Sequence, residues 1–248
     1  VFFFVFWSKN FLPFFPVLKS MEKYYHFYFH FTITGLPEIL EPGLPDTQQS
    51  IETFGKLSRR YGKQRMIWRF DPIILSNRIN RDHIFKRFRE LASRLSGKSQ
   101  RCIISFVQHY ARARVRFKAL QKKHGLVIEN TPLEEQREIA YHLSGIAEQY
   151  GFSLYACCQD HLVEGPIKKA HCIDKEFFNI FGLKEEPLGQ NPTRKGCGCF
   201  DSRDIGSYNT CPHKCVYCYA NGNTTRIDTF YNKYKNDNTL RYKASLNW

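Results

Sequence analysis

Three cysteines stand close together near the end of the sequence, in the stretch NTCPHKCVYCYANG at residues 209–222. Cys211, Cys215 and Cys218 give the spacing C-x3-C-x2-C, which puts three thiols on one short loop. Three thiolates on one loop can converge on a cuboidal [4Fe–4S] cluster, whose ordinary sites use four cysteines. The spacing therefore predicts a cluster in which one iron has no protein ligand and can bind a small molecule.

Zinc is the main alternative occupant of these thiols, although zinc prefers four closed ligands, commonly as two C-x2-C-type pairs. His213 could supply a fourth ligand, but its place inside the loop makes that reach awkward. A third alternative is three buried thiols without a metal. The spacing favours iron–sulfur over both.

A second set of cysteines lies upstream. Cys197 and Cys199 form C-x-C, Cys172 sits in the stretch HCID, and Cys157 and Cys158 are adjacent. Cys158 (or Cys157), Cys172, Cys197 and Cys199 form a candidate second metal site. It could hold a fully ligated second cluster, or a structural zinc that pins a loop-rich segment. The alternative is free thiols in the core.

Strand-like and helix-like segments alternate along the first 156 residues. Runs of aromatic and β-branched residues predict strands, and apolar residues at helical spacing predict helices. Repeated alternation argues for parallel strands with helices outside, and a (β/α) barrel, partial or permuted and TIM-like, fits better than an open sheet. We expect strands at 1–7, 24–35, 64–73, 101–107 and 152–158, and helices at 46–61, 80–96 and 131–151.

In such barrels the chemistry sits at the C-terminal ends of the strands, and polar residues recur there in this sequence. Arg69 and Asp71 lie on the same side of one strand, where they could bind a carboxylate or form a structural salt bridge, which we favour. Lys9, Thr34 and Ser105 hold similar positions. Each alone is typical of a cap or turn, but together they are candidate pocket residues.

The net charge of +14 is concentrated in one segment, because residues 78–123 hold fourteen Lys and Arg against two acidic residues. A local basic field attracts nucleic acid or another polyanion. The alternative is the solvated outer face of two helices.

The nine cysteines are an odd set in a chain large enough to fold without disulfides, which favours a reducing, cytoplasmic compartment and metal binding by clustered thiols. The opening run VFFFVFW begins with Val1, is interrupted by Lys9 and Asn10, and is shorter than the ~20 apolar residues of a membrane span. It predicts a buried strand and no membrane role, and its start inside an apolar run suggests a missing beginning.

The triplet resembles the signature of the radical S-adenosylmethionine (SAM) superfamily, which places an aromatic residue directly before the last cysteine, as Tyr217 does here. That superfamily uses a full or partial (β/α) barrel. The resemblance implies that Cys211, Cys215 and Cys218 ligate a [4Fe–4S] cluster, that the open iron chelates SAM, and that Tyr217 flanks the adenine. Reduction by an electron donor would then yield a 5′-deoxyadenosyl radical, with an unknown substrate.

The whole chain resembles an uncharacterised bacterial family, domain of unknown function 1848, which has this late triplet. The matching stretches include VFWSKN, FYFHFTITG, RCIISFV, HCID and CGCFDSRDIGSYNTCPHKCVYCYAN. Members begin with a strand that is absent here, so we expect residues 1–156 to form a barrel portion without its first strand. Residues 157–248 would be a Cys-rich segment that completes the barrel, with a strand at 202–209, and carries the cluster loop.

Two departures from the superfamily remain. The triplet usually follows the first strand, and no Gly-Gly-Glu-like segment for the SAM amino group is present. The sequence therefore supports cluster binding more firmly than SAM binding. A non-catalytic zinc- or cluster-bound module that binds nucleic acid is the alternative function.

Overall fold

The computed structural model describes residues 2–184, 187–222 and 224–234. The chain divides into two compact units, each built from separate stretches of sequence. Unit 1 comprises residues 1–35, 45–107 and 129–202, and unit 2 comprises residues 36–44, 108–128 and 203–248.

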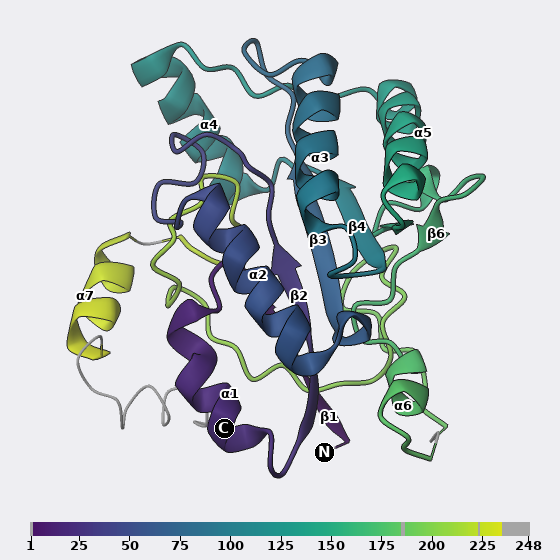
Figure 1. The fold of residues 1–248 in the computed structure, drawn as a ribbon. Coiled ribbons are helices and arrows are strands. Elements are labelled where there is room, and N and C mark those ends of the chain that lie inside the picture. Colours follow the sequence, from purple (N-terminus) through teal and green to yellow (C-terminus); the bar gives the residue numbers. More distant parts are fainter. Residues whose placement is uncertain (1, 185–186, 223, 235–248) are drawn as a thin grey trace. The chain divides into compact units, whose positions relative to one another are not determined.

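A six-stranded parallel sheet forms the centre of unit 1, with its strands in the same order as in the sequence (Figure 1). The expected mixed α/β fold with parallel strands is therefore confirmed. The strands are β1 (Phe3–Ser8), β2 (His26–Thr32), β3 (Met66–Ile73), β4 (Arg101–Phe106), β5 (Ser153–Ala156) and β6 (Lys168–Lys169).

Alternation along the strands divides the side chains between the two faces of the sheet. One face carries large apolar side chains such as Phe31, Trp68 and Phe70, which are all buried. On this face Trp68 stacks on Phe88 with ring centroids 4.9 Å apart, and Phe31 packs on Phe54 at 5.6 Å. These partners belong to α3 and α2, so the apolar face is the one that the helices cover.

Polar side chains cap the N-termini of two helices of unit 1. The side chain of Asp46 accepts a hydrogen bond from the Gln49 backbone N–H, and Asn80 does the same for His83, which satisfies two otherwise unpaired donors. The helices are α1 (Phe15–Met21), α2 (Thr47–Tyr61), α3 (Arg81–Leu95), α5 (Leu133–Gln149) and the short α6 (Glu176–Ile180), with 3-10 turns η1 (Leu12–Phe14), η2 (Lys63–Arg65) and η3 (Asp160–Leu162).

The other face of the sheet is covered by the segment that follows β5 and holds few regular elements. Tyr28 of β2 stacks on Phe177 of α6 with ring centroids 3.4 Å apart, and its hydroxyl donates to the Cys172 carbonyl at 2.7 Å. Arg101 of β4 pairs with Asp174 at 2.8 Å. This segment therefore depends on contacts with polar and aromatic groups of the sheet.

Unit 2 contains the helices α4 (Ala111–His124) and α7 (Thr224–Tyr234), together with the segments 36–44 and 203–222. The expected strand at 202–209 is wrong, because these residues have no strand assignment and end in a turn. Gly206 lies in this stretch, and the Asp204 side chain accepts from its backbone N–H in a local turn that competes with strand pairing.

The opening run forms strand β1 as expected, but the strand lies at one end of the sheet and is only partly buried. Trp7 is 49% exposed, and the other β1 residues are half-buried. No helix among the described residues is long and apolar enough to span a membrane.

Candidate functional site

The triplet cysteines lie in unit 2 on a loop without helix or strand. Cys211 is exposed, Cys215 is buried and Cys218 is half-buried. The Cys218 backbone N–H donates to the Cys215 carbonyl at 3.1 Å, which closes a turn between these two residues. Lys214 has a positive φ of 53°, which for a non-glycine residue indicates a conformation that the surrounding contacts impose.

Arg116 of α4 holds the C-terminal half of this loop. Its guanidinium donates to the carbonyls of Val216 at 2.6 Å, Asn221 at 2.5 Å and Cys218. The planar fork of arginine suits such a set of acceptors. Burial lowers the pKa of Arg116, whereas the nearby Cys218 raises it. The guanidinium therefore faces the cysteine loop.

The segment 36–44 holds the other side of the loop. The Val216 N–H donates to the Leu40 carbonyl at 3.0 Å, and the Gly43 N–H donates to the His213 carbonyl at 3.1 Å. The approach is close, because a Cβ on Gly43 would lie 2.8 Å from the Pro212 oxygen and 2.8 Å from the His213 Cα. Only glycine fits there without displacing backbone.

Tyr217 is half-buried, and its hydroxyl donates to the Glu41 carboxylate, which is only 6% exposed. Burial, followed by the charge of Glu41, raises the pKa of Tyr217 well above its usual range. Its hydroxyl thus anchors the loop to the segment 36–44. The expectation that Tyr217 flanks an adenine stays a prediction.

Asn221 lies three residues after Cys218 and is 4% exposed. Its Nδ2 donates to the Cys211 carbonyl at 2.8 Å, so it ties the two ends of the loop together. Its Oδ1 is buried and has no hydrogen-bond partner among the residues that the structure describes. An unpaired buried acceptor is costly, and a ligand donor at this place would satisfy it.

His213 is the fourth ligand in the zinc alternative for the triplet. Its Nδ1 lies 2.9 Å from the Gly43 carbonyl, which accepts the hydrogen bond and so fixes Nδ1 as the protonated nitrogen. Within the described part of the chain, no group of three or more His, Cys, Asp or Glu side chains is arranged to hold a single metal ion.

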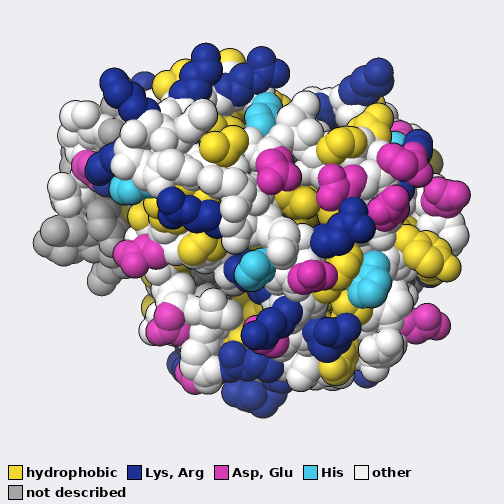
Figure 2. All heavy atoms as spheres, turned by 90° about the horizontal axis from the view of Figure 1, so that it is seen from above, with side chains coloured by type: hydrophobic (Ala, Val, Ile, Leu, Met, Phe, Trp, Pro, Cys, Tyr) yellow, Lys and Arg dark blue, Asp and Glu magenta, His cyan; other side chains and the backbone are white. Residues whose placement is uncertain are grey.

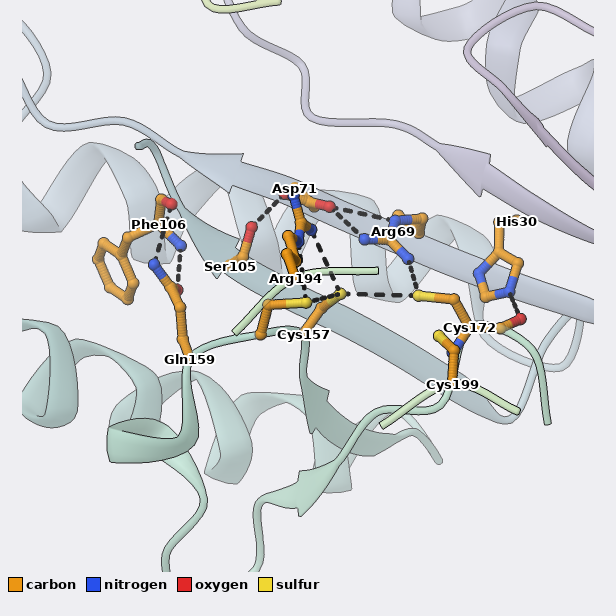
Figure 3. A network of polar contacts seen from close by, with 11 residues as sticks. His30, Arg69, Asp71, Ser105, Phe106, Cys157, Gln159, Cys172, Arg194 and Cys199 are labelled. Carbon is orange, nitrogen blue, oxygen red and sulfur yellow. Dashed lines mark hydrogen bonds and ion pairs between the residues drawn. The ribbon is translucent and has the colours of Figure 1, made fainter. Parts of the chain in front are cut away.

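The upstream cysteines gather in unit 1, on the sheet face opposite α2 and α3 (Figure 3). The sulfurs of Cys157 and Cys158 are 3.8 Å apart, and those of Cys157 and Cys172 are 3.6 Å apart. Hydrogen bonding to Cys172 and, less strongly, to Cys197 lowers the pKa of Cys199 to about 5 despite burial. The set expected from the sequence is therefore brought together, with Cys157 as a central member.

Two arginines point their guanidinium groups at these sulfurs (Figure 3). Arg69 donates from Nη1 to Cys172 Sγ at 3.1 Å, and Arg194 donates from Nε to Cys158 Sγ at 3.0 Å. Arg69 also pairs with Asp71, from Nε at 3.1 Å and from Nη2. The salt bridge expected from the sequence is thus present.

Ser105 joins this network, because its hydroxyl donates to the second oxygen of Asp71. Three of the five candidate pocket residues are therefore hydrogen-bonded in one group on β3 and β4. Lys9 follows β1 and is half-buried, and Thr34 follows β2 and is buried.

His30 on the same face was given no role by the sequence. Its Nε2 donates to the Cys172 carbonyl at 2.9 Å, and burial lowers its pKa to about 3, so the ring is neutral.

Sequence reasoning also missed Arg116, Glu41 and Asn221, whose roles depend on contacts between distant segments. Asn221 alone carried a local signal, as a polar residue three positions after the last cysteine of the triplet.

A family model described as "Domain of unknown function (DUF1848)" matches residues 1–220, which is most of the chain. The chain belongs to the DUF1848 family. No curated protein and no solved structure matches it. Membership in the DUF1848 family assigns no activity, so the function must be argued from the loop and its supports.

Proposed function

We propose that this DUF1848 chain is a radical-SAM-type iron–sulfur enzyme whose cluster is held by Cys211, Cys215 and Cys218. The observation that carries the proposal is a loop that places three thiols at the spacing C-x3-C-x2-C and is fixed from outside the motif by Arg116 and by the segment 36–44. This donor set suits a cluster with one open iron better than a closed tetrahedral zinc site.

The burial of the three cysteines and the supports of their loop also fit a bound cluster. Burial and exposure differ along the triplet, with Cys215 inside and Cys211 at the surface, so a group bound by all three would sit at the edge of unit 2. The loop is held from outside the triplet, by Arg116 on one side and by Glu41 and Gly43 on the other. When bound and reduced, such a cluster supplies an electron that cleaves SAM to methionine and a 5′-deoxyadenosyl radical.

The residues of the loop supply binding and positioning. Arg116 places a cation beside the cysteine loop and so lowers the electrostatic cost of thiolates there. Tyr217 and Glu41 keep the loop in register with the segment 36–44 through the hydroxyl–carboxylate bond. Asn221 Oδ1 offers a buried acceptor next to Cys211, which we assign to the amino group of SAM in the absence of a Gly-Gly-Glu-like segment.

The topology of unit 1 supports the expected barrel. Right-handed crossovers between strands that follow one another in a single direction place every connecting helix on the same face, whereas a doubly wound sheet reverses direction. The order β1 to β6 has no reversal, and α2 and α3 pack on one face. We therefore propose a partial (β/α) barrel in which the polar face with Arg69 and Asp71 corresponds to the interior.

A nucleic acid or another polyanion is the substrate class we propose, through the basic segment 78–123. Helix α4 alone carries Arg114, Lys118, Lys122 and Lys123 as exposed cations. Figure 2 shows several separate groups of Lys and Arg side chains on one face, with Asp and Glu side chains between some of them. The same cations favour the second candidate, a non-catalytic module that binds nucleic acid.

The deciding experiment is anaerobic reconstitution with iron and sulfide, followed by reduction in the presence of SAM. We expect about four irons at the triplet, absorbance around 400 nm, and release of 5′-deoxyadenosine. A Cys211→Ala, Cys215→Ala and Cys218→Ala triple variant should lose all three properties, whereas Cys102→Ala, at a buried cysteine in β4, should keep them. Zinc in place of iron at the triplet, together with nucleic-acid binding and no SAM cleavage, would establish the non-catalytic module instead.

A further inference from the structure

The second cysteine cluster in unit 1 is not used by the function proposed above. The Cys157 sulfur contacts those of Cys158 and Cys172, Cys199 belongs to the same buried cluster, and Cys197 packs against it. The cluster lies where β5 and β6 end, since Cys157 follows β5 directly and Cys172 comes three residues after β6. Carboxyl ends of parallel strands are the usual place for sites in α/β folds.

The donors around these sulfurs show that they are placed to carry negative charge. Cys199 Sγ accepts from the backbone N–H groups of Cys172 at 3.2 Å and Ile173 at 3.5 Å. The guanidinium groups of Arg69 and Arg194 are directed at two further sulfurs, as described above. A neutral thiol is only a weak acceptor, so two cations and two N–H groups aimed at sulfur fit thiolates.

Several adjacent thiolates in a buried site repel one another and are costly to desolvate. Cys157, Cys172 and Cys199 are between 4% and 9% exposed and belong to the apolar core that also holds Tyr28 and Phe177. A bound metal cation offsets both the repulsion between the thiolates and their desolvation cost. Its positive charge keeps the coordinating thiols deprotonated and compensates their negative charge. The two arginines would compensate the remaining negative charge of a tetrathiolate site.

The spacing of the sulfurs indicates which kind of centre fits. A tetrahedral ion with metal–sulfur bonds of about 2.3 Å holds its sulfurs about 3.8 Å apart. The Cys157–Cys172 separation of 3.6 Å is close to this edge length. Cysteines on an iron–sulfur cube bind different irons, so their sulfurs stand farther apart, and a disulfide at about 2.05 Å is much shorter.

We propose that Cys157, Cys172, Cys197 and Cys199 bind one Zn²⁺ ion in unit 1. The contacts run as an open chain, and no three His, Cys, Asp or Glu side chains of the described chain already surround one point. Rotation about the Cα–Cβ bonds of Cys197 and Cys199, two residues apart in a loop, would close the chain around the ion. Cys158 stays outside, because its sulfur contacts Cys157 alone among the described thiols, whereas the Cys157 sulfur also contacts Cys172.

The zinc ion would stabilise a segment that has little regular secondary structure. Among the described residues of the segment 157–202, which covers one face of the sheet, the regular elements are a 3-10 turn, a two-residue strand and a five-residue helix. Such a segment makes few repetitive backbone hydrogen bonds, and a closed zinc site would fix its two halves, around Cys157 and Cys199, to each other. The proposal does not depend on the triplet loop or on SAM chemistry.

Metal analysis of the full chain tests the site separately from the triplet. In the Cys211→Ala, Cys215→Ala and Cys218→Ala background we expect about one zinc per chain and no iron. Adding Cys157→Ser or Cys199→Ser should abolish zinc, whereas adding Cys158→Ser or Cys102→Ala should retain it. Absence of zinc in the triple variant, or iron with absorbance around 400 nm in its place, would overturn the proposal.

A second measurement covers the case in which Cys157→Ser or Cys199→Ser does not fold. The folded wild-type chain is alkylated with iodoacetamide before and after removal of zinc by a chelator, and the modified cysteines are identified by mass spectrometry. We expect Cys172, Cys197 and Cys199 to become reactive only after chelation, although Cys197 is half-buried rather than buried. Equal reactivity of Cys197 with and without the chelator would count against a ligand role.

Discussion

The guanidinium of Arg116 on α4 donates to the carbonyl of Val216, 2.6 Å away, in the middle of the cysteine triplet. This bond joins a helix to a loop that is about 100 residues later in the sequence. The thiols of the triplet are therefore positioned by groups that lie outside the motif itself. Changes to those supports should alter cluster retention without removing any ligand.

Replacing Arg116 by Lys should reduce the iron content of reconstituted protein, because an ammonium cannot serve three carbonyls that the guanidinium fork serves at once. Bonds from a charged donor contribute roughly 1.5–3 kcal/mol each, so the loss should be large enough to loosen the loop. Arg114→Lys, at an exposed position of the same helix, is the matched control. Equal iron content and equal protease resistance of the loop in both variants would show that Arg116 does not hold it.

Gly43→Ala should destabilise the loop for a different reason, because the new Cβ would lie 2.8 Å from the Pro212 oxygen. We expect a lower Tm and less bound iron. Gly145→Ala in α5 is the control, since a Cβ there meets nothing within 4 Å and alanine favours a helix by about 0.5–1 kcal/mol. A Gly43→Ala variant as stable and as iron-loaded as Gly145→Ala would contradict the close approach of the two segments.

The sequence predicted most of the sheet and its helical layer, because these elements are encoded by local patterns. Strand and helix periods, with caps such as Asp46 and Asn80, are readable within a short window. Helix α1 was not predicted, since no helical pattern was read around Pro13 and Pro16, although proline fits the first turn of a helix. The two-residue strand β6 is too short to leave a pattern.

Residue type and spacing predicted which side chains form the candidate site, but not which distant segments bring them together. Cysteine spacing identified both thiol groups, but the central place of Cys157 follows from which side chains the ends of β5 and β6 bring together. Arg69 and Asp71 were readable as a pair because they share one strand face. Glu41 and Tyr217 are 176 positions apart, and no local pattern connects them.

Removing the Tyr217 hydroxyl tests that long-range contact. Tyr217→Phe leaves the buried Glu41 carboxylate without this donor, which should destabilise unit 2 by about 1–3 kcal/mol. Glu41→Gln in the Tyr217→Phe background should recover part of the loss, because a neutral amide is less costly to bury. Denaturant unfolding of the single and double variants gives the coupling, and additive effects would mean that the two side chains do not depend on each other.

A pH-dependent contribution is expected from Glu22, which accepts from Arg60 at 2.9 and 2.5 Å and from Tyr61 at 3.0 Å. Hydrogen bonding to Arg60 lowers the pKa of Glu22 below its value of 4.5 in the unfolded chain, despite the opposing effect of partial burial. A lowered folded-state pKa contributes stability that is present above that value and lost as the pH falls through the folded pKa.

Glu22→Gln should therefore reduce the free energy of unfolding near neutral pH, and the difference from wild type should shrink as the pH falls through the lowered pKa of Glu22. Urea titrations at several pH values give this difference directly. Glu164→Gln, at an exposed carboxylate after η3, should show no such trend. A Glu22→Gln difference that stays constant with pH would mean that the ion pair is not the cause.

The two polar atoms of the Asn221 side chain, Nδ2 and Oδ1, can be tested separately. Asn221→Ala removes both the Nδ2 bond to the Cys211 carbonyl and the free Oδ1 acceptor, whereas Asn221→Asp removes the donor and keeps an acceptor. If Oδ1 binds the SAM amino group, Asn221→Ala should weaken SAM binding by roughly tenfold or more, and Asn221→Asp should retain it. Equilibrium dialysis with reconstituted protein of matched iron content measures this, with Asn209→Ala as a loop variant that leaves Asn221 unchanged. Equal SAM affinity in Asn221→Ala and wild type would assign the residue to loop closure alone, since the bond to Cys211 would then be its whole contribution.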